Sequence, residues 1–242
     1  MPTGIIVNSL SVAAGAVFGC LFGHRLSNDF KENLNMIFGV CSMAMGISAI
    51  VLMENMPAVI FSVIIGTALG LVVHLGNRIS KACEGMQHIV SRLLPAKTSG
   101  MSEEEFNATL ITIIVLFCAS STGIYGCIVS GMTGDHTILL SKSILDFFTA
   151  MIFACILGPV VAFIALPKFG LFVVLYLLAG FIYPLTTPSM INDFKACGGI
   201  LMVATGFRML KLRMFPTADM IPAMLLAMPC SWFWQAVITP LL

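Results

Sequence analysis

The chain has 242 residues, of which 59% are hydrophobic and only 10% charged, and its mean hydropathy is +1.03. A soluble globular domain carries about 25% charged residues, so this composition excludes that class and indicates a membrane protein. The net charge of +1 gives no general attraction to nucleic acid.

Apolar segments of about 20 residues, the length that crosses the hydrocarbon core of a bilayer, recur along the whole chain. The first is predicted to be a retained helix, because no basic region precedes it and no small-residue cleavage site follows it. We therefore predict an all-α polytopic protein, with residues 1–242 forming a single integral membrane domain. The eight predicted transmembrane helices are 4–23, 36–53, 57–75, 106–131, 143–166, 169–186, 194–212 and 217–238.

The distribution of lysine and arginine predicts the orientation of these spans. With the N-terminus outside, the outer side receives only Lys142 and Lys195. The inner side then receives Arg25, Lys31, Arg78, Lys81, Arg92, Lys97, Lys168, Arg208, Lys211 and Arg213. This asymmetry predicts that the N-terminus and the C-terminus both lie outside.

Two stretches of the chain carry similar residues in the same order, about 164 residues apart. The matched groups are Asn28-Asp29-Phe30-Lys31 with Asn192-Asp193-Phe194-Lys195, Ala14-Gly15 with Ala179-Gly180, Gly39…Gly46 with Gly199…Gly206, and Pro57-Ala58 with Pro222-Ala223. They predict an inverted 3+3 repeat, in which helices one to three (about 4–75) correspond to helices six to eight (about 169–238). The alternative is that both Asn-Asp copies are merely helix-start signals.

The sizeable loop 76–105 is predicted to lie on the cytoplasmic side. Its apolar residues recur at three- and four-residue spacing, with basic residues on other positions, which is typical of an amphipathic helix. Two roles stay open for it, at the inner membrane interface or as a connector packed on the bundle.

The central helices, 106–166, contain two predicted interruptions. Ser120, Ser121, Thr122 and Gly123 fall near the middle of helix four, and Gly158-Pro159 near the middle of helix five. Hydroxyl groups and glycine at bilayer depth can loosen the backbone ladder, and proline removes one of its hydrogen bonds. Two adjacent interrupted helices predict a substrate site at the midplane. Alternatively, the small residues let neighbouring helices approach closely.

Three polar residues are candidates for a solute or ion pathway. Asp146 follows Lys142 by four residues, and a carboxylate in hydrocarbon is costly unless it faces a cavity or a partner. It could bind a cation, relay protons, pair with Lys142, or remain solvated at the outer interface. Asn8 could line a path or make an interhelical hydrogen bond.

Glycines four residues apart predict close helix packing within one protomer, and a homodimer contact as the second possibility. They are Gly15, Gly19 and Gly23 on helix one, and Gly66 and Gly70 on helix three. The eight cysteines and seventeen methionines are scattered, so no metal site is predicted. No catalytic signature is present, and neither a cofactor nor enzymatic activity is expected.

Parts of the chain resemble a known family. They are Leu116–Ser130 (LFCASSTGIYGCIVS), Lys142-Ser143-Ile144-Leu145-Asp146 and Cys197-Gly198-Gly199. They are similar to the bacterial inner-membrane family typified by YdfK and YqgA, which is defined by a domain of unknown function. The resemblance covers essentially the whole chain, but Ala119-Ser120-Ser121-Thr122 stands where the family suggests a glycine-methionine pair. It implies the fold and an inner-membrane location, and it names no substrate.

The main functional hypothesis is a secondary transporter or facilitator that moves a small solute or ion across the bilayer. An ion channel is an alternative that the same symmetry permits. A third is a membrane scaffold or sensor that uses residues 76–105 to engage a partner.

Overall fold

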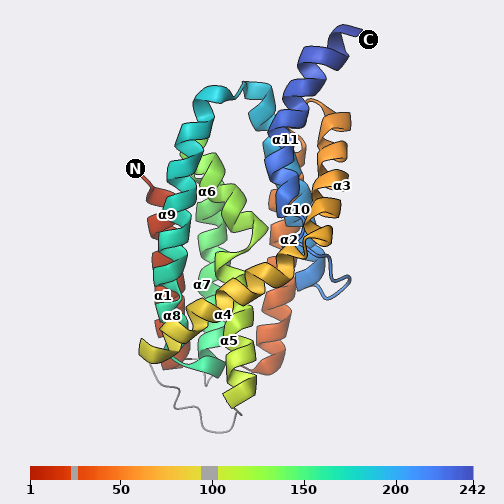
Figure 1. The fold of residues 1–242 in the computed structure, drawn as a ribbon. Helices are drawn as coiled ribbons and strands as arrows, with labels where there is room; N and C mark the ends of the chain where they lie inside the picture. Colours follow the sequence, from red (N-terminus) through yellow and green to blue (C-terminus); the bar gives the residue numbers. More distant parts are fainter. Residues whose placement is uncertain (23–26, 94–102, 242) are drawn as a thin grey trace. The chain divides into compact units, whose positions relative to one another are not determined.

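The structure is a computed structural model that describes residues 1–22, 27–93 and 103–241. Every regular element within these ranges is helical (Figure 1). The longer helices are α1 Thr3–Phe22, α2 Asn28–Ile50, α3 Met56–Val72, α4 Leu75–Leu93, α5 Glu103–Cys118, α6 Ser121–Thr133, α7 Thr137–Leu157, α9 Ala165–Ile182, α10 Pro188–Met209 and α11 Ile221–Phe233. Short helical turns complete the set: α8 Val160–Phe163, η2 Tyr183–Leu185, η3 Trp234–Ile238 and η4 Thr239–Leu241.

Length and apolarity make six stretches of the described chain candidates to cross a membrane, or seven if α3 and the first half of α4 count as one bent span. The six are Thr3–Phe22, Asp29–Ile50, Thr109–Thr133, Thr137–Leu157, Val160–Leu185 and Ile221–Leu241. The chain is therefore a multi-pass membrane protein, with fewer qualifying spans than the eight predicted. Helix α10, which covers most of the predicted span 194–212, is not among them and carries Asp193, Lys195 and Arg208.

The contacts of the chain divide it into two compact units. The first unit comprises residues 1–35 and 78–179, and the second comprises residues 36–77 and 180–242. Each unit is described by itself below.

In the first unit, α1 packs along α7 with the two backbones in direct contact. A Cβ atom on Gly15 would overlap the carbonyl oxygen of Phe147, and one on Gly19 would overlap that of Met151. From Gly15 to Gly19 on α1, the contact moves forward from Phe147 to Met151 on α7, so the two helices run parallel. Gly15 and Gly19 therefore pack closely against a helix of the same chain, as predicted. The third glycine of this spacing, Gly23, lies outside the described residues.

The two predicted interruptions have different outcomes. The fourth predicted span is broken as expected, because α5 ends at Cys118 and α6 begins at Ser121. The interruption at Gly158-Pro159 is also present, but its predicted place in the middle of one span is wrong, since the two residues end α7 and separate two candidate spans. Gly158 has φ +74°, a left-handed conformation that glycine adopts at low cost, and the next candidate span begins at Val160.

Helix α4 is the predicted amphipathic helix. Within the first unit, Cys83 is buried in an apolar cluster that includes Phe106 and Leu110, and Ile79 packs against it. Its described apolar face thus covers part of this core, which agrees with the connector alternative for these residues.

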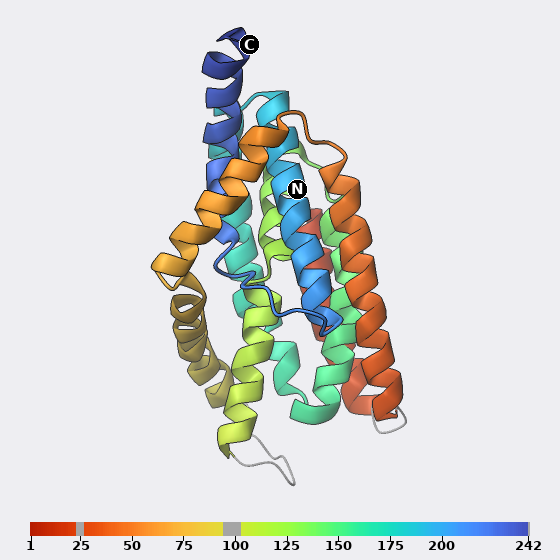
Figure 2. The same cartoon turned by 90° about the vertical axis from the view of Figure 1, so that its right-hand side faces the viewer.

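The second unit contains two close helix pairs, α2 with α10 and α3 with α11 (Figure 2). A Cβ atom on Gly46 would crowd the carbonyl oxygen of Gly199, and one on Gly199 would crowd that of Gly46. Gly39 and Gly206 pack against each other in the same way, seven residues away on each helix. Gly66 and Gly70, the predicted packing residues of α3, lie against Ala223 of α11 and against Asp219 just before that helix.

Candidate functional site: a buried ionic cluster in the first unit

The carboxylate of Asp146 is the centre of a buried polar cluster. One of its oxygens accepts from Lys142 Nζ at 2.7 Å, and the other from Lys168 Nζ at 2.6 Å. The second oxygen also accepts from Asn8 Nδ2 at 2.9 Å. Asn8 and Lys168 are 0% exposed, Asp146 is 4% exposed and Lys142 is 6% exposed. Helices α1, α7 and α9 therefore converge on one occluded ionic site.

The cluster forms a polar layer between two apolar clusters of the same unit. On α7, Leu139 belongs to one apolar cluster and Ala150 to the other, with Asp146 between them along one helix face. Asn8 stands likewise between Ile5 and Val12 on α1. The three- and four-residue spacing places each polar side chain on an otherwise core-facing stripe. Their positions in the sequence therefore place these groups between the two apolar clusters.

The depth of Asp146 decides between the predicted alternatives. It is the tenth residue of the 21-residue helix α7 and is buried, so it is not a solvated cap at a helix start. It forms the ion pair with Lys142 that was one of the predicted possibilities. Because two ammonium groups already contact its oxygens, a cation would be repelled from the carboxylate in this arrangement.

The prediction for Lys168 is wrong. The sequence predicts it at the inner surface, in a short connection between predicted helices five and six, whereas it lies fully buried in α9. The error follows from the extension of helix five through Gly158-Pro159, which left Lys168 in a loop. One signal could have identified it: Lys168 falls three residues after Ala165 and four before Phe172, on the buried stripe of α9.

The two lysines have different surroundings. Lys168 Nζ lies 5.3 Å from the ring centroids of both Phe117 and Phe172, a distance at which aromatic faces attract a cation. Lys142 runs beside the first turn of α6, where a Cβ atom built on Gly123 would lie 3.2 Å from its Cε. Lys168 is thus enclosed by rings and carboxylate, while Lys142 borders the break between α5 and α6.

The break itself is built by the predicted hydroxyl residues. Ser120 caps α6, because its side chain accepts a hydrogen bond from Gly123 N at 3.2 Å. Ser121 and Thr122 are buried in the first turn of α6. The first N–H groups of a helix carry positive partial charge, so this turn adds to the positive character beside Lys142. Gly158 and Pro159, by contrast, belong to the turn after α7, and their backbone hydrogen bonds are to Ala154, Val161 and Ala162 rather than to the cluster.

The second unit has a buried acid of a different kind. Asp193 accepts from the backbone N–H groups of Glu54 and Asn55, both at 2.9 Å, and from Asn55 Nδ2 at 2.8 Å. Ser231 Oγ donates to it at 2.6 Å. These four donors satisfy the carboxylate at the N-terminus of α3, which is a structural role. The sequence predicts Asp193 as part of the repeat or as a helix-start signal, whereas it lies inside α10, whose N-cap is Thr187.

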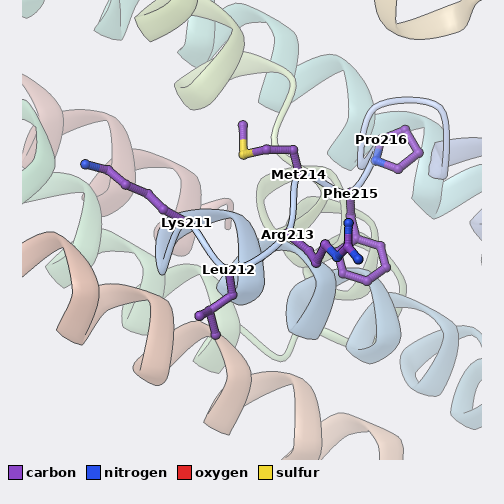
Figure 3. A pocket seen from close by; sticks show the side chains of 6 residues that line it. All are labelled: Lys211, Leu212, Arg213, Met214, Phe215 and Pro216. Atoms are coloured by element: carbon purple, nitrogen blue, oxygen red, sulfur yellow. The ribbon is translucent and has the colours of Figure 1, made fainter.

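Arg208 holds a surface turn. Its guanidinium donates to Phe215 O at 3.1 Å and to Thr217 Oγ1 at 2.7 Å. The turn that it braces lines an open hollow of about 590 Å³ (Figure 3). In this view, the side chains of Lys211, Leu212 and Met214 point in different directions from the turn, so they do not converge on one point.

Comparisons with known proteins support the resemblance. Residues 3–232 match the family described as "Protein of unknown function (DUF554)". The chain is 43% identical to "Uncharacterized protein YqgA" of Escherichia coli (strain K12), over 98% of this chain and 99% of that protein. It is 28% identical to "Uncharacterized membrane protein YdfK" of Bacillus subtilis (strain 168), over 92% of this chain and 93% of that protein. No solved structure matches it. The chain therefore belongs to the DUF554 family, as the YdfK and YqgA resemblance in its central motif predicted.

Proposed function

We propose that this protein is a secondary transporter or facilitator that moves a small solute or ion across the bacterial inner membrane. The observation that carries the proposal is the contact of Asp146 with Lys142, Lys168 and Asn8 inside candidate membrane spans. Ionisable residues at such depth are costly and usually mark a substrate or ion pathway. A protein that only needed to pack its helices would be more stable with apolar residues there.

The broken span supports a transport role as well. In many transporters, discontinuous helices place half-helix ends at the substrate site. Here the α5–α6 break lies between Cys118 and Ser121, and Lys142 runs along its first turn. The broken backbone and the ionic cluster therefore lie in one layer of the first unit.

The proposal includes the inverted repeat, with both termini outside. Its support is the reciprocal contact in the second unit, where Gly39 meets Gly206 and Gly46 meets Gly199. In the sequence repeat, Gly39 corresponds to Gly199 and Gly46 to Gly206. A twofold operation that exchanges α2 and α10 would convert one of these contacts into the other, as inverted repeats require. Reporter fusions at both termini test the orientation, and a cytoplasmic signal from either would contradict it.

Transport is tested by flux measurements on purified protein in proteoliposomes, with a broad panel of small ions and metabolites. The proposal expects a saturable flux for at least one solute, which Asp146→Asn abolishes. No flux for any panel member, or a flux that Asp146→Asn leaves unchanged, would contradict it. Unsaturable flux at conductance-level rates would instead assign a channel. If no solute flux is found and removal of residues 79–93 abolishes the protein's function in the cell, the membrane scaffold or sensor would be favoured.

A further inference from the structure

The ionic cluster carries more positive than negative charge. Lys142 and Lys168 share one carboxylate, and the ion pairs of the described chain offer neither lysine another acid. With both lysines charged, the cluster has an excess of one positive charge at a site where every member is at most 6% exposed. An uncompensated charge in a dry environment is strongly unfavourable. A bound anion would compensate it.

The anion would bind to Lys142 rather than to Lys168. Lys168 is fully buried, bonded to Asp146 at 2.6 Å and flanked by Phe117 and Phe172. Each lysine donates to Asp146 with one of its three N–H groups, but the Lys142 side chain is 8% exposed and that of Lys168 is 0% exposed. Lys142 therefore retains donors for a ligand, while Lys168 acts as the permanent counter-ion of Asp146.

One further group borders Lys142, and another belongs to the same cluster. The first turn of α6, a helix of 13 residues, lies beside the stem of Lys142, and helix N-termini favour anions. The side-chain oxygen of Asn8 is buried without a hydrogen-bond partner, although its amide nitrogen bonds to Asp146. This oxygen is an acceptor, so a water molecule would satisfy it and could donate its second hydrogen to a bound anion.

We propose that the cluster binds one small monovalent anion, held by Lys142 at the N-terminal turn of α6. The single excess charge sets the valence, and the occlusion of the cluster favours an anion of few heavy atoms, such as a halide, nitrate or formate. The inference rests on the proposed transport function for its role, since the anion would be the transported solute.

The inference is tested by anion binding to the purified protein in detergent, with gluconate as the bulk anion. Chloride, nitrate and formate are titrated separately, and the unfolding temperature is followed because a ligand of the folded state stabilises it. Saturable stabilisation is expected for at least one of them, and none for sulfate at equal ionic strength. Lys142→Met should weaken this binding at least about 30-fold, as expected for loss of a buried charge contact. Lys142→Arg should retain binding, and so should Lys81→Met, which removes an exposed lysine of α4.

The outcomes separate this inference from the proposed function. No saturable stabilisation by any of the three probes would overturn it, as would equal binding by Lys142→Met. If Lys142→Met does not fold, selectivity for monovalent anions over sulfate in the unsubstituted protein decides the question. Anion binding without flux would contradict transport but support the site. Saturable flux of an uncharged solute or a cation, unaffected by Lys142→Met, would support transport and overturn the anion site.

Discussion

Replacement of Asp146 by asparagine tests whether this carboxylate holds the first unit together. Asparagine preserves the size of the side chain and one acceptor oxygen, but it leaves Lys142 and Lys168 without a negative partner. The two contacts measure 2.7 Å and 2.6 Å. At an effective dielectric constant of about 20, each corresponds to roughly 6 kcal/mol of attraction before desolvation is counted. Removal of one partner of a buried pair costs about 3–5 kcal/mol net, and we expect this loss of unfolding free energy.

The assay is equilibrium unfolding in detergent micelles, followed by the circular dichroism of the helices. The control is Asp29→Asn, which removes an exposed acid from the first turn of α2 and should cost at most about 1 kcal/mol. Lys142→Met should cost less than about 1 kcal/mol, because Lys168 and Asp146 remain as a neutral pair. Combined with Asp146→Asn, it should restore part of the lost stability. The reasoning is refuted if Asp146→Asn unfolds within about 1 kcal/mol of the unsubstituted protein.

Three further substitutions, two of them paired with a matched control, test the contacts described above by the same unfolding assay. Gly15→Ala should cost about 1–3 kcal/mol, because its Cβ would overlap the α7 backbone. Gly180→Ala at the matching repeat position, which has open space, should be neutral or slightly stabilising; equal effects would contradict the contact. Asp193→Ala should cost about 2–3 kcal/mol through loss of the bonds to the α3 N-terminus, whereas Asn192→Ala should cost under about 1 kcal/mol. Gly158→Ala should cost about 1–3 kcal/mol, because its φ of +74° with ψ of −155° is a conformation that essentially only glycine adopts, and an unchanged stability would argue against that turn.

Parts of the candidate site could be predicted from local patterns. The four-residue spacing of Lys142 and Asp146 places them on one helix face, and the hydroxyl run at Ser120 marks the break between α5 and α6. Asn8 was identifiable as a polar residue in an apolar helix. Each of these features depends on residues within about one helical turn of each other, so it can be recognised from the sequence without knowing the tertiary structure.

The rest depends on where helices end and on distant contacts. Gly158 and Pro159 can kink a helix or end it, and the tertiary structure selects the second outcome. That choice decides whether Lys168 is a loop residue or a buried one, and hence whether the cluster has one lysine or two. The role of Asp193 was hidden for a similar reason, because three of its four donors belong to Glu54 and Asn55, more than a hundred positions earlier in the chain.

Solute flux in proteoliposomes is the most direct test of the account, with the unsubstituted protein compared with Asp146→Asn and Lys142→Met. Lys81→Met serves as the matched lysine control, since this side chain is exposed on α4. We predict saturable flux of a small monovalent anion, which both cluster substitutions abolish and the control preserves. The account is contradicted if no panel solute moves, or if the folded cluster variants carry the same flux as the unsubstituted protein.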